Sequence, residues 1–206
     1  MVVIVDYGMG NLGSILNKIE RLGAEVIISS NAKDIEEAGK LILPGIGTFV
    51  AGVEKLINYN LLDILNKKVL ADKIPVLGIC LGMQLMTKKS EEGNVNGFGW
   101  IEAETKRFIF EENNIKLKIP HIGWNSLNIK RNSSLLKDIP TDAEFYFVHS
   151  YHVCCAMQDD VILATTHYGY DFISAIQKEN IFGTQFHPEK SHKHGIKIIE
   201  NFINLC

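Results

Sequence analysis

Short apolar runs alternate with amphipathic stretches along the first half of the chain. The apolar runs are typical of buried strands, and they occupy residues 2–6, 25–29, 40–45 and 75–79. Between them, apolar residues recur every three or four positions, which predicts helices over 12–22, 32–38, 49–58, 60–70 and 81–88. This alternation predicts an α/β fold, with a central, mostly parallel sheet and helices on both of its faces.

The second half of the chain has a different pattern, in which apolar and polar residues alternate singly. This period of two predicts strands over 98–110, 115–130, 144–155, 161–169 and 172–188. We expect them to be antiparallel strands added to the parallel sheet, followed by a last helix over 196–205. No linker, repeat or low-complexity tract divides the chain, so the sequence predicts a single domain over residues 1–206.

Composition and charge narrow the class of protein. Of the 206 residues, 46% are hydrophobic and 22% are charged, and the formal net charge is −3, so no nucleic-acid partner is expected. No apolar run is long enough for a membrane span, and Asp6 interrupts the N-terminal run too early for a signal peptide. The four cysteines are too scattered for a disulfide framework or a zinc site. We therefore expect a cytoplasmic protein.

The fourth predicted strand ends at a cysteine between two glycines, in the sequence Gly78-Ile79-Cys80-Leu81-Gly82. A nucleophile on a sharp strand-to-helix turn crowds the residues two before and two after it, and glycine relieves that crowding. The N–H groups that open the next helix favour a thiolate and can bind an oxyanion, with the Leu81 N–H as the first donor. The pattern predicts a catalytic Cys80; the alternative is a buried cysteine at a tight helix–strand contact.

A nucleophilic cysteine needs a base, and His187 is the best candidate among the seven histidines. It follows a strand pattern that a proline closes, and the Glu189 carboxylate, two residues further on, can turn back to orient the imidazole. A lone histidine here would more often be structural, but the combination with Cys80 predicts a Cys-His-Glu triad. His192 and His194 could join His187 in a metal site, but the ligand spacing is poor and no metal is expected.

These motifs carry a resemblance to a known enzyme family. The segments GICLGMQ (78–84), PGIGTF (44–49) and FHPEKS (186–191) resemble those of the class I glutamine amidotransferases, which have a flavodoxin-like fold. The segments DYGMGNLGS (6–14), PHIGWN (120–125) and FVHSYH (147–152) are similar to those of the glutaminase subunits of imidazole glycerol phosphate synthase, which act in histidine biosynthesis. The resemblance extends from Asp6 to about Ser191.

The resemblance implies a glutaminase that needs no cofactor. L-Glutamine would be hydrolysed to glutamate and ammonia through a thioester on Cys80, with His187 moving the protons and Glu189 holding the imidazole. The oxyanion would be bound by the N–H group of Leu81 and by one from Gly45-Ile46-Gly47.

The resemblance also implies a glutamine pocket lined by Gln84, Glu92, Ser150 and Tyr151. A free amino acid has an ammonium and a carboxylate to match, which suits an acid together with hydroxyl or backbone donors. The sequence supports an exposed, purely structural Gln84 almost equally well. Glu92 is preferred over Glu91 only because of the spacing in the family.

Ammonia would be protonated in water, so such a glutaminase needs a sealed route to a second active site. The resemblance places that site in a (β/α)8 cyclase subunit, bound as a heterodimer, which makes imidazole glycerol phosphate and AICAR. We expect the docking face near the mouth of the site, around Asn11, Ser14 and Lys190, although each could be an ordinary solvated residue. The glycines at 8, 10 and 13 have the spacing of a phosphate-binding loop, but the acidic residue expected about twenty positions downstream is not at a strand end, because Glu25 begins the next strand. The resemblance instead implies that this turn lies near the partner enzyme.

Other functions fit the same residues. A paralogous glutaminase could supply ammonia to a different acceptor enzyme, for example in sugar amidination. A stand-alone triad cysteine hydrolase could act on a peptide or a small amide. A non-catalytic module of the same fold is a further alternative, and the intact set of Cys80, His187 and Glu189 argues against it.

Overall fold

The strands predicted in the first half of the chain form the parallel part of the sheet. The computed structural model describes residues 1–110, 117–155 and 159–206. Parallel strands lie side by side in the order β2 (Val26–Ser29), β1 (Val2–Val5), β3 (Lys40–Leu43) and β4 (Val76–Ile79). Because side chains alternate between the faces, Val3 and Val5 join one hydrophobic core and Val2 and Ile4 join the other.

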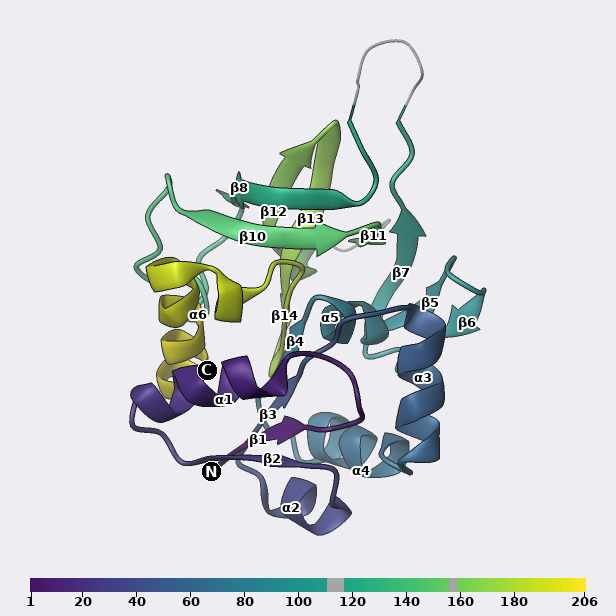
Figure 1. The fold of residues 1–206 in the computed structure, drawn as a ribbon, viewed down its shortest axis with the longest axis vertical. Coiled ribbons are helices and arrows are strands. Elements are labelled where there is room, and N and C mark those ends of the chain that lie inside the picture. The colour runs from purple at the N-terminus through teal and green to yellow at the C-terminus, as the bar shows by residue number, and fades with distance from the viewer. Residues whose placement is uncertain (111–116, 156–158) are drawn as a thin grey trace.

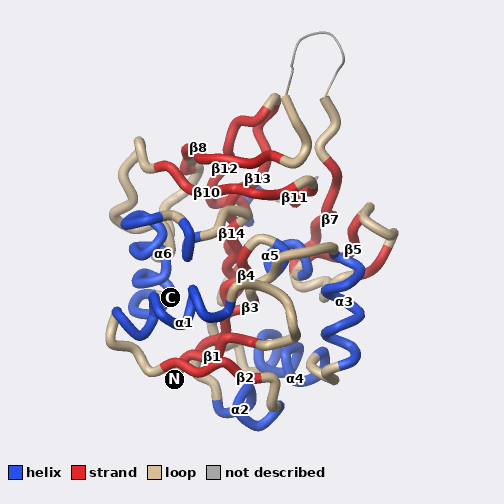
Figure 2. The backbone as a smooth tube through the Cα atoms, in the orientation of Figure 1, coloured by secondary structure: helices blue, strands red, loops and turns tan. Residues whose placement is uncertain are grey.

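Helices cover both faces of this sheet, as Figures 1 and 2 show. One core contains residues of α1 (Leu12–Arg21) and α6 (His192–Leu205). The other contains residues of α2 (Ala32–Glu37), α3 (Phe49–Asn58), α4 (Leu62–Asn66) and the short π-helical segment Lys67–Ala71. The short helix α5 (Leu81–Leu85) starts directly after Cys80, at the carboxyl end of β4.

The second half of the chain extends the sheet from β4. Strand β14 (Ile181–Thr184) pairs with β4 in parallel, and β13 (Tyr170–Lys178) pairs with β14 in antiparallel. The sheet continues through β11 (Tyr151–Cys154), β7 (Ile101–Arg107), β5 (Thr87–Ser90) and β6 (Val95–Asn96). Strand β12 (Ile162–Tyr168) pairs with β13 and with β9 (Asn128–Ile129).

The predicted α/β fold, with antiparallel strands added to a mostly parallel sheet, is confirmed, although several details differ. Strands β8 (His121–Ser126) and β10 (Glu144–His149) form a separate two-stranded sheet rather than joining the main one. The predicted strand over 172–188 is a hairpin, because Glu179 turns the chain at a φ of 51°. The start of the predicted strand over 115–130 lies outside the described residues.

The helix predicted over 81–88 ends at Leu85, and this part of the prediction is wrong. Thr87 is fully buried and starts β5, which pairs with the distant strand β7. Its hydroxyl donates to the carbonyl of Gln84 at 2.8 Å, a bond that competes with further helical hydrogen bonds. The last helix begins at His192 instead of residue 196.

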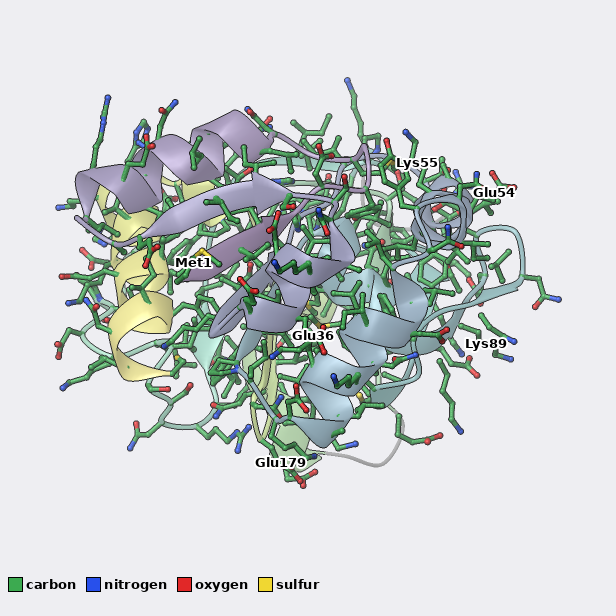
Figure 3. The ribbon with its side chains drawn as sticks, turned by 90° about the horizontal axis from the view of Figure 1, so that it is seen from below. Met1, Glu36, Glu54, Lys55, Lys89 and Glu179 are labelled. Carbon is green, nitrogen blue, oxygen red and sulfur yellow. The ribbon has the colours of Figure 1, made fainter. Side chains whose placement is uncertain are left out.

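Charged side chains lie around the outside of the helical layers. In Figure 3, Glu54, Lys55 and Lys89 lie at the outer edge of the molecule. Glu36 makes an exposed ion pair with Lys67 at 2.6 Å, a type of contact that adds little to stability. Within the described ranges, no helix is long and apolar enough to cross a membrane.

Candidate active site

Cys80 lies at a tight turn between β4 and α5, with a φ of 53° and a ψ of −108°. These angles are sparsely populated by residues other than glycine and indicate a strained backbone. A Cβ atom at Gly78 would lie 2.7 Å from the Met83 nitrogen, and one at Gly82 would lie 1.8 Å from the Leu43 carbonyl oxygen. Both glycines are therefore required by close backbone contacts on the two sides of the cysteine.

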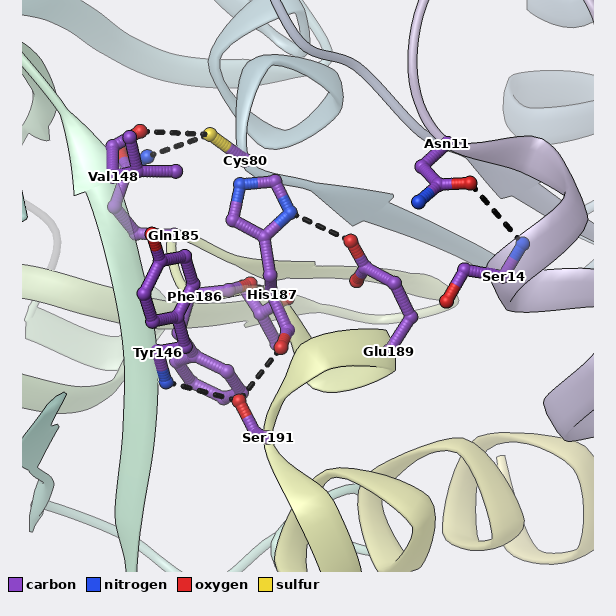
Figure 4. Close-up of polar contacts among 11 residues, drawn as sticks. Asn11, Ser14, Cys80, Tyr146, Val148, Gln185, Phe186, His187, Glu189 and Ser191 are labelled. Atoms are coloured by element: carbon purple, nitrogen blue, oxygen red, sulfur yellow. Dashed lines mark hydrogen bonds and ion pairs between the residues drawn. The ribbon is translucent and has the colours of Figure 1, made fainter. Parts of the chain in front are cut away.

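His187 and Glu189 form a buried pair next to Cys80. The Nδ1–H of His187 donates to Oε1 of Glu189 at 2.8 Å, and the two side chains are only 1% and 2% exposed. In Figure 4 the imidazole ring lies between the Cys80 sulfur and the Glu189 carboxylate. This order of groups is the one that a nucleophile, its base and an orienting carboxylate require.

The surroundings of His187 favour its charged form. Burial by itself lowers the pKa of His187, but the nearby Cys80 sulfur and the hydrogen bond to Glu189 outweigh it and raise the pKa to about 9. The Nε2 atom is buried and has no hydrogen-bond partner among the described residues, so the sulfur lies beside it outside hydrogen-bond geometry. His187 therefore carries a proton at neutral pH.

The loop between β3 and α3 packs against Leu81, the residue that follows Cys80. A Cβ atom at Gly45 would lie 2.7 Å from the Cβ of Leu81 and 2.8 Å from the Tyr7 hydroxyl. That hydroxyl donates to the Pro44 carbonyl at 2.5 Å. Gly10 also braces this loop, because a Cβ there would lie 3.2 Å from Pro44 Cβ. The N-terminal glycine turn therefore supports the loop beside Leu81.

The loop is also fixed where α3 begins. Glu92 accepts a hydrogen bond from the Phe49 backbone N–H at 2.6 Å and so binds the first turn of the helix. Between the fixed ends, Ile46 and Gly47 are exposed, and Gly47 has a φ of 128°, a value that glycine adopts readily.

A cavity of about 280 Å³ opens in front of the sulfur. It brings together most of the residues that the sequence analysis proposed for the reaction and for glutamine binding: Ile46, Gly47, Cys80, Leu81, Gln84, Glu92, Ser150, Tyr151 and His187. Pro120, Val148 and His149 complete the lining. Gly45 and Glu189 lie behind this surface, where they pack against Leu81 and His187.

Gln84 is buried, and its alternative as an exposed helix residue is wrong. Its Nε2 donates to the Tyr151 carbonyl at 2.9 Å and to Oε1 of Gln185 at 3.1 Å. Glu91, the alternative to Glu92, is exposed, accepts a hydrogen bond from the Arg107 backbone and does not line the cavity.

The three residues expected at the partner face lie outside the cavity. Asn11 caps α1 by accepting a hydrogen bond from the Ser14 backbone N–H at 3.3 Å, so it also has a structural role. Figure 4 places Asn11 and Ser14 on the Glu189 side of the site. The Lys190 ammonium lies 5.6 Å from the centroid of the Tyr146 ring.

Two buried residues beside Cys80, Gln185 and His149, were not predicted from the sequence. Gln185 donates from Nε2 to the Cys80 sulfur at 3.6 Å, and His149 lines the cavity. The signal for Gln185 in the sequence is its place two positions before His187, because alternate residues of the strand pattern predicted there would share a face. In the structure β14 ends at Thr184, and Gln185 lies in the bend that follows. Across the described parts of the chain, no group of three or more His, Cys, Asp or Glu side chains could hold a metal ion.

Comparison with known proteins agrees with this geometry. A model of the family "Glutamine amidotransferase class-I" matches residues 3–205. The chain is 49% identical to imidazole glycerol phosphate synthase subunit HisH 2 of Methanococcus maripaludis, and the alignment covers 98% of each chain. It is 44% identical to subunit HisH 1 of that organism and 43% identical to HisH 2 of Pseudomonas aeruginosa, each over 100% of both chains.

The fold has solved counterparts. A crystal structure of a glutamine amidotransferase superimposes with a TM-score of 0.71 at 19% identity, and the match covers 98% of this chain and 97% of that one. At this level of identity the likeness concerns the fold. The family model and the relatives that are 43–49% identical over the whole chain show that it belongs to the class I glutamine amidotransferases and, within them, to the HisH family.

Proposed function

We propose that this chain is the glutaminase subunit of an imidazole glycerol phosphate synthase and that Cys80, His187 and Glu189 form its catalytic triad. One observation carries the proposal: Cys80 lies on a strained turn at the wall of a cavity, beside the buried pair of His187 and Glu189. This arrangement supplies a nucleophile, a base and an orienting carboxylate. We assign the activity to one domain, residues 1–206, in the cytoplasm.

The reaction follows from the positions of these groups. His187 takes the proton of the Cys80 thiol, and the thiolate attacks the side-chain amide carbon of glutamine. The carbon–nitrogen bond of the tetrahedral intermediate then breaks while His187 returns that proton to the nitrogen, which leaves as ammonia. Water, deprotonated by His187, then attacks the thioester, and glutamate leaves as the carbon–sulfur bond breaks. The N–H of Leu81 and one from Gly45-Ile46-Gly47 would bind the oxyanion, and each such donor contributes roughly 3–4 kcal/mol.

The cavity suits the two ends of a free amino acid. One carboxylate oxygen of Glu92 is used by α3, and the other is left to bind the substrate ammonium. The hydroxyls of Ser150 and Tyr151 can donate to the substrate carboxylate. Because the N–H groups of Gln84 are directed at protein acceptors, its side-chain oxygen is the atom left for a substrate N–H group.

The partner in this proposal is a (β/α)8 cyclase subunit, bound as a heterodimer near Asn11, Ser14 and Lys190. Ammonia released into water would be protonated, so the acceptor site has to be reached by a shielded route. Beside Lys190, the two-stranded sheet exposes apolar and aromatic surface, with Ile122 59% and Trp124 43% exposed. Exposed apolar and aromatic side chains close to a catalytic cavity are common in docking surfaces.

A second candidate is a glutaminase that feeds a different acceptor enzyme, such as one that amidinates a sugar. Its support is that Methanococcus maripaludis has two subunits of this kind, HisH 2 and HisH 1, to which the chain is 49% and 44% identical. A duplicated subunit can serve a second acceptor while it keeps the same triad, so the two candidates differ in the partner and share the chemistry at Cys80.

The test is glutamine hydrolysis by the full chain alone, with the cyclase, and with the cyclase plus an analogue of its acceptor, using Cys80→Ala as the inactive control. We expect slow turnover alone and an increase of roughly 10²–10³-fold in the loaded complex, the effect of adding one oxyanion donor. Full activity of the free chain would contradict the synthase-subunit proposal. Activation by a sugar-modifying enzyme and not by the cyclase would support the second candidate, and equal turnover of other amides would support a stand-alone hydrolase.

A further inference from the structure

Gln185 is a fully buried polar residue that the triad chemistry leaves unexplained. It lies directly after β14, and its backbone N–H donates to the Ser174 carbonyl at 2.9 Å, which fixes its main chain. Its side-chain amide lies between two groups of the site. One end is 3.1 Å from Nε2 of Gln84, and the other is 3.6 Å from the Cys80 sulfur.

The orientation of this amide follows from a backbone carbonyl. The carbonyl of Tyr151 can only accept hydrogen bonds, so the Gln84 atom 2.9 Å from it must be the amide nitrogen. The same nitrogen lies 3.1 Å from one end of the Gln185 amide, and that end must therefore be the oxygen. The end facing the Cys80 sulfur must then be the nitrogen, which donates an N–H to the sulfur.

A second donor fixes the Tyr151 carbonyl itself. Nδ1 of His149 lies 2.8 Å from the carbonyl oxygen and donates to it. Burial lowers the pKa of His149, so the ring is neutral, and its Nε2 accepts from Nδ1 of His121 at 3.1 Å. The two lone pairs of the carbonyl are thus occupied by Gln84 and His149. Gln84 cannot turn its oxygen toward this carbonyl without losing a buried hydrogen bond.

We propose that Gln185 is a hydrogen-bond donor to the reacting sulfur of Cys80, and that Gln84 and the Tyr151 carbonyl are the positioning groups that hold it there. The inference deepens the proposed glutaminase function and rests on it for the identity of the substrate. An N–H donor binds a thiolate more strongly than a neutral sulfur, so the contact favours the charged nucleophile. The same donor stabilises the sulfur when it leaves the thioester, so it acts in both half-reactions.

The hydrogen bonds that the Cys80 sulfur can make differ between its neutral thiol form and its charged thiolate form. The sulfur also lies 3.9 Å from the Val148 carbonyl, which is an acceptor for an S–H group. A thiol can donate to that carbonyl while it accepts from Gln185. After the proton has moved to His187, the Val148 carbonyl can no longer accept a hydrogen bond from the sulfur, whereas the Gln185 amide still donates one to it.

The experiment is alkylation of Cys80 by iodoacetamide in the full chain as a function of pH, read by mass spectrometry of the Cys80 peptide. Gln185→Met keeps the volume and removes the donor, and Gln185→Glu keeps the shape but turns a negative oxygen toward the sulfur. The matched control is Gln177→Met, because Gln177 lies on β13 and contacts Ser133 instead of the site. We expect Gln185→Met to react roughly 10–100-fold more slowly at neutral pH, with the profile moved to higher pH, and Gln185→Glu to be slower still.

The control should follow the native profile. A native pH profile in folded Gln185→Met would overturn the inference, and if that variant does not fold, a native profile in Gln185→Glu would overturn it equally. Alkylation involves no glutamine, so its outcome is independent of the proposed function. In the active complex, Gln185→Met should lower kcat while KM for glutamine changes little, whereas a purely structural residue would leave the alkylation profile where it is.

Discussion

Replacing Cys80 by glycine should destabilise the fold much less than the same change in an ordinary buried position. The residue has a φ of 53° and a ψ of −108°, which strains the backbone of any residue with a Cβ atom by about 1–3 kcal/mol. Glycine adopts these angles freely. The informative comparison is between Cys80→Ala and Cys80→Gly, because both lack the thiol and only the alanine variant keeps the strain.

The expected difference can be worked out from opposing contributions. Relief of strain favours glycine by about 2 kcal/mol. Two contributions destabilise the glycine variant relative to the alanine variant. The greater freedom of glycine in the unfolded chain costs about 0.5–1 kcal/mol, and the loss of the buried methyl group costs about 0.8 kcal/mol. Cys80→Gly should therefore be as stable as Cys80→Ala or slightly more stable. At the fully buried Ala175 in β13, Ala175→Gly lacks the relief and should cost about 1.5 kcal/mol.

The assay is urea unfolding of the isolated chain, followed by the fluorescence of Trp100 and Trp124. Trp100 is 2% exposed and Trp124 is 43% exposed, so the two respond differently to unfolding. If the glycine variant at position 80 loses as much stability relative to alanine as the variant at position 175, the backbone at the nucleophile is not strained and the reasoning is refuted.

Three further predictions concern the triad. His187→Ala should reduce glutamine turnover in the complex as much as Cys80→Ala does. The reduction caused by Glu189→Ala should be roughly 100-fold smaller, because the carboxylate only orients the base. Equal reductions would contradict this and give Glu189 a more direct role. Iodoacetamide should label Cys80 much faster than Cys155 near neutral pH, because burial raises the pKa of Cys155 to about 11. The rates can be measured by peptide mass spectrometry, and similar rates for the two cysteines would contradict the prediction. The pKa of His187 rises from 6.5 in the unfolded chain to about 9 in the folded one, so its contribution to stability is complete below pH 6.5 and is lost as the pH rises to 9. Unfolding free energies measured over this range should fall more steeply for the native chain than for His187→Gln, and parallel curves would argue against a charged His187.

The sequence predicted the fold well where local pattern decides the structure. The parallel strands are nearly continuous apolar runs because both of their faces are buried, and such runs are visible without knowledge of the partners. The helix after Cys80 was predicted too long, because Thr87 enters a strand only through pairing with β7, which starts more than a dozen residues later. Pairing between distant segments overrides local preference and leaves little trace in the pattern.

The site residues also divide into those that local sequence motifs predict and those that depend on contacts between distant segments. Cys80, His187 and Glu189 belong to short motifs whose spacing reflects a turn, and the cavity residues named from the family resemblance line the pocket. Gln185 was missed because its contacts lie 101 and 105 positions away along the chain, at Gln84 and Cys80. The role of Gln185 depends on the orientation of the Tyr151 backbone carbonyl, and the pattern of side chains along the sequence does not predict that orientation.

The loop between β3 and α3 is clamped at both ends, by the Tyr7 hydroxyl on Pro44 and by the Glu92 carboxylate on Phe49. The exposed bridge between the clamps is only Ile46, Gly47 and Thr48. We expect that the activation proposed for the bound partner, the addition of one oxyanion donor from this loop, needs only the rotation of a single peptide plane here, with no movement of β3 or α3. Substitutions intended to change activity should therefore be made at residues 46–48. Substitutions at Pro44 or Phe49 would weaken the contacts that fix the ends of the loop.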